Sequence, residues 1–206
     1  MYSVLFLGEG PSDRGIVTHI YRIAESCGKS VIVTAPDVGS LPSPDRSVHG
    51  KLGSIREIGG EYDLVVIHRD ADRDGPEARL AEILGAATSL MPGSLCVPAI
   101  PVRMTEAWLI LDEQQIRRVA GNPNGTMDLA IPSWKEAERI ADPKGLLREL
   151  LLTASGLTGR KRKTLSARLS YQRSQMLETL DPDGPVSKLP SWNRFQSRLS
   201  DAFSTL

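Results

Sequence analysis

The stretch DLVVIHRDAD, residues 63–72, joins a short apolar run to two acids that follow it. Residues 63–68 are typical of a strand buried on both faces of a parallel sheet. Residues 3–7 read in the same way, end at Gly8 and are followed by Glu9. Open α/β sheets bind their ligands outside the carboxyl ends of the strands. Glu9, Asp70 and Asp72 therefore predict a functional site at one edge of a parallel sheet.

The rest of the first half predicts alternating helices and strands. Apolar residues recur at helical spacing after Ser12 and Asp13, either of which can cap a helix that Gly28 ends. Pro98 makes the last expected strand an edge strand or an irregular one, and Thr105 can cap the helix after it. The expected strands are 3–7, 30–35, 63–68 and 95–102, and the expected helices are 13–27, 52–58, 76–89 and 105–111. This order predicts an α/β fold with a mainly parallel sheet and flanking helices.

The character of the chain changes beyond Gly121, where a loop rich in Pro, Asn and Gly leads into helical patterns. The expected helices of this part are 134–140, 143–157, 165–180 and 191–199. We therefore expect a core at residues 1–120 and a mostly helical C-terminal extension at residues 121–206 that packs on this core. Residues 36–60 are expected to form a surface excursion, because Pro, Gly, Ser and Asp are frequent there.

Composition and charge are those of an ordinary globular protein. The 206 residues are 40% hydrophobic and 24% charged, which argues against disorder. Lys and Arg together number 25, as do Asp and Glu, so attraction to nucleic acid has to come from a local basic patch. Cys27 and Cys96 are too few for a disulfide framework and indicate free thiols in a reducing cytoplasm. No run of about eighteen apolar residues and no basic leader is found, so we expect a cytoplasmic protein without a membrane span.

The spacing of the acids suggests a metal site. In an extended backbone the side chains of Asp70 and Asp72 point the same way, so both carboxylates can share a cation. Clustered carboxylates repel one another and need a counter-charge. Mg²⁺ accepts one or two carboxylates while it keeps waters and phosphate oxygens as further ligands. In phosphoryl transfer such ions activate water, and two can act together about 4 Å apart.

These residues resemble a known family. Glu9 in GEGPSD, the Asp70-x-Asp72 pair after an apolar strand, and the βα alternation between them are similar to the TOPRIM domain of topoisomerases, primases and OLD-type nucleases. This resemblance covers roughly the first half of the chain and implies a TOPRIM-like, Rossmann-like sheet. The runs VRMTEAWLILD and DPKGLLREL, with Ser191, Trp192 and Phe195, resemble a small stand-alone TOPRIM-like family of unknown function that is linked to phage defence. That narrower resemblance spans nearly the whole chain.

The resemblance implies roles for five residues as the catalytic set. Glu9 would be a metal ligand or a general acid or base, and Asp70 and Asp72 would be metal ligands. Glu106 would be an additional acid, and Lys144 a cation that steadies the phosphate. His68 and Asp74 are not required by the TOPRIM pattern. The implied activity is that of a Mg²⁺- or Mn²⁺-dependent nuclease that acts on DNA or RNA.

Other interpretations of the same residues stay open. The acids at 70, 72 and 74 also fit a solvated turn that caps a helix beginning at Pro76, and Glu106 fits the first turn of a helix, where the dipole favours a carboxylate. The basic run Arg160, Lys161, Arg162 and Lys163 is either a nucleic-acid contact or a solvated charged face. At the level of the whole chain, one alternative is a TOPRIM-like subunit that binds an ABC-type ATPase partner and is inactive or regulatory alone. Another is a degenerate domain that binds metal or nucleotide without catalysis.

Overall fold

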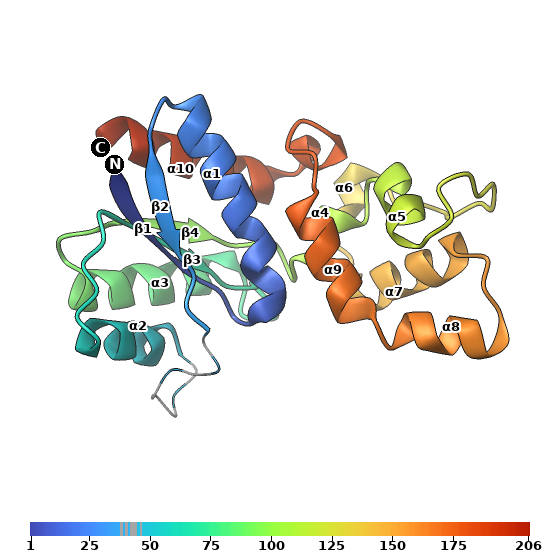
Figure 1. The fold of residues 1–206 in the computed structure, drawn as a ribbon, viewed down its shortest axis with the longest axis horizontal. Helices are drawn as coiled ribbons and strands as arrows, with labels where there is room; N and C mark the ends of the chain where they lie inside the picture. Colours follow the sequence, from blue (N-terminus) through green and yellow to red (C-terminus); the bar gives the residue numbers. More distant parts are fainter. Residues whose placement is uncertain (38, 40, 42–44, 46) are drawn as a thin grey trace.

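The fold is built on one parallel β-sheet. The computed structural model describes residues 1–37, 39, 41, 45 and 47–206. The strands are β1 (Tyr2–Leu7), β2 (Val31–Thr34), β3 (Leu64–His68) and β4 (Leu95–Ala99), in the order β2-β1-β3-β4 (Figure 1). All pairs are parallel. The predicted α/β fold with a parallel sheet is confirmed, and the arrangement is compatible with a Rossmann-like fold.

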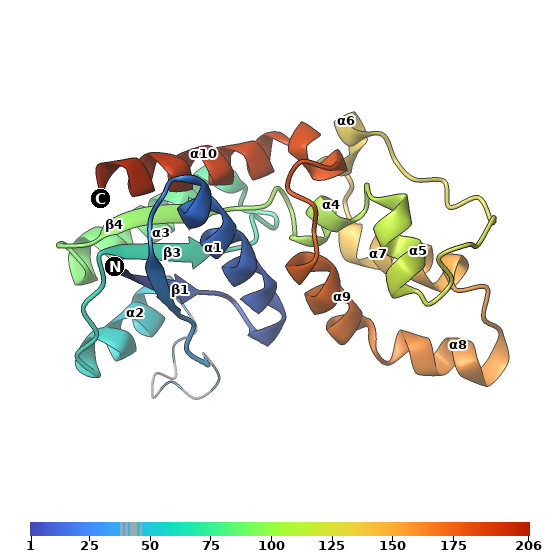
Figure 2. The same ribbon diagram turned by 45° about the horizontal axis from the view of Figure 1, so that its top comes forward.

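Helices cover both faces of the sheet. Helices α1 (Ile16–Ser26) and α10 (Pro190–Thr205) lie on one face, and α2 (Val48–Glu57) and α3 (Pro76–Leu90) lie on the other (Figures 1 and 2). Alternate strand residues serve the two layers, because successive side chains of a strand point to opposite faces. Val4 and Phe6 pack with the α1 side, and Leu5 and Leu7 pack with the α2 side. Both faces are therefore apolar, which is why the strands read as continuous hydrophobic runs.

The strand order places a ligand-binding position between β1 and β3. The chain runs from β1 to β2 on one side and then returns to the other side of β1 with β3. Ligands of open α/β sheets bind at such a reversal, outside the carboxyl ends of the strands. Leu7 lies opposite Ile67 in the register of β1 and β3. The residues after these two strands, including Glu9 and Asp70, therefore leave the sheet side by side.

A group of helices lies beside this end of the sheet (Figure 2). They are α4 (Glu106–Leu109), α5 (Glu113–Val119), α6 (Trp134–Ala137), α7 (Pro143–Ala154), α8 (Gly159–Ser166) and α9 (Leu169–Glu178), followed by the 3₁₀ turn η2 (Pro185–Lys188). Helix α9 packs on the 3₁₀ turn η1 (Pro11–Gly15) that precedes α1. Gly15 makes this approach possible, because a Cβ there would lie 2.6 Å from the backbone nitrogen of Glu178. The helical part is thus joined closely to the sheet domain.

The last helix returns to the sheet. Helix α10 packs against β4 and α1, with Trp192 and Phe195 buried against Trp108 of α4. The indole nitrogen of Trp108 donates a hydrogen bond of 2.7 Å to Ser191 Oγ. The Tyr2 hydroxyl donates to the carbonyl of the last residue, so the two ends of the chain lie side by side. Helix α9 contacts η1, and α10 is one of the helices that cover the sheet. The expected border between residues 120 and 121 stays a prediction.

The expected elements differ from the observed ones mainly at their ends. The expected strand 95–102 ends at residue 99, and the expected helices 134–140 and 143–157 end at residues 137 and 154. One expected helix, 165–180, is replaced by the end of α8 and the separate helix α9. Part of the expected excursion at 36–60 lies outside the described residues, and α2 occupies 48–57. Cys27 and Cys96 are unpaired, as expected. Within the described residues, no helix combines the length and apolar character needed to cross a membrane.

Candidate functional site

A cavity of about 670 Å³ lies at the carboxyl ends of β1 and β3, between the sheet and the helical part. Its walls include all five residues that the sequence predicts to be catalytic, which are Glu9, Asp70, Asp72, Glu106 and Lys144. The first three follow β1 and β3, Glu106 begins α4, and Lys144 lies in the first turn of α7. The fold therefore brings residues that are up to 135 positions apart in the sequence to one cavity.

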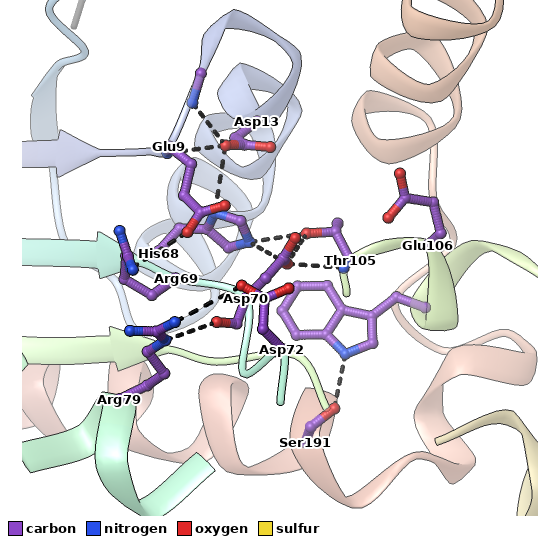
Figure 3. A network of polar contacts seen from close by, with 12 residues as sticks. Glu9, Asp13, His68, Arg69, Asp70, Asp72, Arg79, Thr105, Glu106 and Ser191 are labelled. Carbon is purple, nitrogen blue, oxygen red and sulfur yellow. Dashed lines mark hydrogen bonds and ion pairs between the residues drawn. The ribbon is translucent and has the colours of Figure 1, made fainter. Parts of the chain in front are cut away.

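Asp13 shapes the loop that carries Glu9. Its side chain is buried, and its Oδ2 accepts hydrogen bonds from the backbone nitrogens of Glu9 at 2.9 Å and of Gly10 at 3.0 Å (Figure 3). Its Oδ1 accepts a hydrogen bond of 2.9 Å from Arg173 Nη1. Both oxygens are thus engaged inside the protein. Asp13 is therefore a carboxylate that fixes the loop, and it also lines the cavity.

His68, at the end of β3, is buried between two acids. Its Nδ1 lies 3.4 Å from Asp13 Oδ2, and its Nε2 lies 2.8 Å from Thr105 Oγ1 and 3.5 Å from Asp70 Oδ1. The Thr105 hydroxyl donates to Asp70 Oδ1 at 2.9 Å, so toward His68 it has to accept. Nε2 therefore carries a proton. Nδ1 faces the Asp13 carboxylate at ion-pair distance but makes no hydrogen bond in aligned geometry among the described residues. The two neighbouring carboxylates favour an imidazolium.

The pKa values of these three groups follow from this arrangement. Burial alone would lower the pKa of His68, but Asp13 and Asp70 raise it to about 10. Burial alone would raise the pKa of Asp13 and of Asp70. His68, with a further contribution from Arg173, instead holds the pKa of Asp13 well below its ordinary value and lowers the pKa of Asp70. A buried charge is tolerated when it is paired and hydrogen-bonded. His68 is therefore an internal cation that keeps Asp70 ionised and in place.

Arg173 of α9 forms a second internal cation. Its Nε donates a hydrogen bond of 2.9 Å to Glu106 Oε1, and its Nη1 donates to Asp13. Burial alone would lower the pKa of Arg173, but Glu106 and Asp13 raise it. Arg173 also lines the cavity. Glu106 is only 4% exposed and is paired with Arg173. Arg173 in turn joins α9 to the loop after β1 through Asp13.

Within the described part of the chain, Glu9 is held in the cavity by a single ion pair without hydrogen-bond alignment. Its Oε1 lies 3.2 Å from Arg69 Nε, but this nitrogen has no partner in hydrogen-bonding geometry among the described residues. The side chain is 32% exposed. Burial and the nearby charge of Asp70 raise the pKa of Glu9. Because like charges at close range disfavour ionisation, this shift indicates that Glu9 and Asp70 face the same space.

Asp72 differs from the expected arrangement. Its φ is +48°, in the left-handed region, so the backbone is not extended there. Its amide donates a hydrogen bond of 2.8 Å to the carbonyl of Arg103, and its Oδ2 lies 3.7 Å from Arg79 Nη2. Asp70 and Asp72 therefore do not present their carboxylates as an alternating pair of a strand. Arg79 is held more tightly by Asp74, at 2.8 Å.

The donor set fits a hard divalent cation only in part. No group of three His, Cys, Asp or Glu in the part of the chain that the structure describes is arranged to hold a metal ion. Among the carboxylates that line the cavity, that of Asp70 raises the pKa of Glu9. Asp70 makes its protein contacts through Oδ1. Carboxylate oxygens supplemented by water suit Mg²⁺, which is commonly bound through one or two carboxylates.

Cations lie on the opposite wall. Lys144 and Arg148 of α7 both line the cavity, and Lys144 forms no ion pair of 4.0 Å or less with the described residues. Arg148 donates to Ser166 Oγ at 3.0 and 3.2 Å, which links α7 to α8. The basic run Arg160, Lys161, Arg162 and Lys163 lies on α8, a helix without a buried residue. It does not line the cavity, and Arg162 is engaged with Glu149.

Four residues of the site have no catalytic or metal-binding role in the sequence-based prediction. Asp13 is expected there to cap a helix, His68 has no assigned role, and Thr105 is expected to cap α4, where it makes no such bond. A short acidic loop after a strand and a histidine two residues before an aspartate are the only hints that the sequence offers for the first two. Arg173 offers none, because its partner Asp13 is 160 positions away.

Comparisons with known proteins leave the chain without an assigned relative. No family model, no curated protein and no solved structure matches it. The resemblance to the TOPRIM domain thus stays an expectation from the motifs. The site has to be interpreted from its own geometry.

Proposed function

We propose that this chain is a metal-dependent phosphodiesterase that acts on nucleic acid and is built on a TOPRIM-like domain. The observation that carries this proposal is one cavity, at the reversal of strand order, with Glu9 and Asp70 on one wall and Lys144 and Arg148 on the other. Carboxylates favour a divalent cation, and lysine and arginine favour a phosphate group. A phosphodiester bound between them would meet both.

Glu9 and Asp70 would hold Mg²⁺ or Mn²⁺, and Asp72 would join them after leaving Arg79. When bound, such an ion supplies a water of lowered pKa and neutralises charge on the phosphate. Glu9 is suited to this role because its pair with Arg69 lacks hydrogen-bond alignment. Asp70 is suited because His68 keeps it ionised. The absence of a three-residue cage among the described residues is compatible with Mg²⁺, which retains water ligands.

The other residues of the site would position these groups. The Thr105 amide and hydroxyl donate to the same oxygen of Asp70, at 2.8 and 2.9 Å, and so set the direction of its second oxygen. Glu106 would act by fixing Arg173, whose guanidinium lines the cavity. Lys144 would contact the phosphate. Some residues of the site would thus contact the substrate, and others would hold these contact residues in position.

The wider setting is part of the proposal. The run Arg160–Lys163 would contact the phosphate backbone outside the cavity, since α8 presents it to solvent. A role in phage defence and a place in the cytoplasm rest on the resemblance alone. An ABC-type ATPase partner stays a prediction, since the contacts within this chain bear on no partner.

Cleavage assays with matched variants test the proposal. Purified protein is incubated with Mg²⁺ or Mn²⁺ and single-stranded DNA, double-stranded DNA or tRNA. Asp70→Asn should reduce cleavage by more than the roughly 10–100-fold that the loss of an outer-shell partner costs. Asp201→Asn, an exposed acid on α10, should cleave like the wild type. Equal rates for wild type and Asp70→Asn, or no cleavage of any substrate with either metal, would count against the proposed function.

A further inference from the structure

The cavity has an apolar wall that phosphodiester chemistry alone does not require. Met104, Leu147, Leu151 and Leu169 line it together with the charged residues. Leu147 and Leu151 are one turn apart on α7 and belong to the buried core, so the accessible part of this wall is formed by Met104 and by Leu169, which begins α9. Ligand pockets of roughly 300–1,000 Å³ commonly combine such apolar walls with a few polar groups that fix orientation. The cavity is therefore built for a ligand with an apolar, ring-like part as well as a charged part.

The charged groups border the same space on both sides of this wall. Lys144 and Arg148 lie on α7, the helix that also provides Leu147 and Leu151. Glu9 and Asp70 lie across the cavity at the ends of β1 and β3. A nucleotide has the matching composition, a flat base joined through a sugar to a phosphate.

We propose that the cavity takes one unpaired nucleotide of a nucleic acid strand, with the base on the apolar wall at Met104 and Leu169 and the phosphate beside Lys144 and Arg148. This inference rests on the proposed function and names its substrate class. In a duplex the bases are stacked and paired, so a base can enter a cavity only after it is unpaired, unstacked and extruded, which costs free energy. The protein should therefore select single strands over duplexes.

The rim of the cavity offers a path for the rest of the strand. Arg148 lines the cavity and donates to Ser166 at the end of α8. The exposed side chains of Arg160, Lys161 and Lys163 lie on this same helix. A strand that leaves the cavity along α8 would meet phosphate-binding cations.

Binding measurements in the presence of EDTA test this inference separately from catalysis. The probes are fluorescein-labelled eight-nucleotide strands of thymidine in DNA and of uridine in RNA, a duplex of the same length, and an abasic sugar-phosphate strand of eight units. The wild type should bind the DNA or the RNA strand at least about tenfold more tightly than the duplex and the abasic strand, because the base of the bound nucleotide loses apolar surface to the cavity wall; tenfold corresponds to about 1.4 kcal/mol. The comparison of the DNA and RNA arms identifies the natural type of strand.

Leu169→Gln provides the matched variant, since it removes apolar contact without adding charge. It should weaken binding of the base-containing strand by about tenfold and leave binding of the abasic strand unchanged, while Leu169→Met should bind like the wild type. Thermal melting of each variant verifies that it is folded. Equal binding of the base-containing and abasic strands, or tighter binding of the duplex, would overturn the inference even if cleavage is observed. Base-dependent binding without cleavage would support the inference and count against the proposed function.

Discussion

Replacing His68 by glutamine is the sharpest test of the charge arrangement in the site. Glutamine retains a side chain of similar length that can donate one hydrogen bond, but it removes the positive charge. Asp13 and Asp70 would then share a buried region without the cation that separates them. Removing one partner of a buried ion pair typically costs about 3–5 kcal/mol, because the remaining charge is left uncompensated.

The pKa shift gives a second measure of the same effect. A rise in the pKa of His68 from 6.5 to about 10 corresponds to roughly 5 kcal/mol of preferential stabilisation of the imidazolium in the folded state. Because the folded pKa is the higher one, this contribution is fully present below pH 6.5 and is lost as the pH rises toward 10. It amounts to about 4 kcal/mol at pH 7, which agrees with the range for a broken buried pair.

Urea unfolding with EDTA present measures the free energy of unfolding from pH 5.5 to pH 10. His68→Gln should be about 3–5 kcal/mol less stable than the wild type near pH 7, and the two should converge near pH 10. His49→Gln, an exposed site on α2, should stay within about 0.5 kcal/mol of the wild type. At acid pH the dependence of stability on pH has the opposite sign. The lowered pKa values of Asp13 and Asp70 stabilise the fold above pH 3.8, and this stability is lost as the pH falls below 3.8. A loss below about 1 kcal/mol at pH 7, or a ¹⁵N spectrum in which His68 loses its proton near neutral pH, would refute the internal cation.

Three further predictions concern packing and the metal. Gly15→Ala should cost about 1–3 kcal/mol of stability, because its Cβ would lie 2.6 Å from the backbone of α9. Gly85→Ala is the control, since its Cβ meets nothing within 4 Å, and it should gain about 0.5–1 kcal/mol. Equal effects of the two variants in urea unfolding would contradict the close approach at Gly15. Ser191→Ala should cost about 1–3 kcal/mol in the same assay, because the buried indole nitrogen of Trp108 loses its acceptor, and an unchanged midpoint would show that another group replaces it. EDTA should abolish cleavage but leave the melting temperature of the purified protein unchanged within about 1 °C. A loss of 1 kcal/mol of stability would lower the melting temperature by about 2–4 °C. Unfolding on chelation would indicate a structural metal.

The sheet could be predicted from the sequence because its strands are apolar on both faces. Residues 3–7 and 63–68 have no amphipathic alternation that would compete with a buried strand. The position of Glu9 and Asp70 at one edge follows from the same fact, since each comes just after such a strand. Their adjacency also needs β1 and β3 to be neighbours, and no local pattern determines that order.

The conformation at Asp72 could not be read from the spacing of the acids. An Asp-x-Asp pair predicts a shared direction only in extended backbone, and the left-handed residue at 72 breaks this condition. Aspartate tolerates that region better than most residues do. The break between α8 and α9 has a similar origin. Helix α8 buries no residue, whereas α9 buries Met176 and Leu177 against η1 and the core, so tertiary packing determines where the second helix starts.

The cations of the site show why its electrostatics escaped prediction. His68 follows an apolar strand, and its charge depends on Asp13 and Thr105, which come from two other segments. Arg173 belongs to a helix that the sequence places in the C-terminal part, with no motif that ties it to the loop after β1. Long-range pairs of this kind become visible only when the fold brings the segments together.

These pairs also define which acid of the cavity is free to exchange partners. Asp13 and Glu106 are both paired with Arg173 at 2.9 Å, and Asp70 lies 3.5 Å from His68. These acids are therefore engaged by cations of the chain itself. Glu9 alone combines a misaligned pair with a raised pKa and access to the cavity. A cation that enters would therefore displace Arg69 from Glu9 first and would leave the buried network around Asp70 intact.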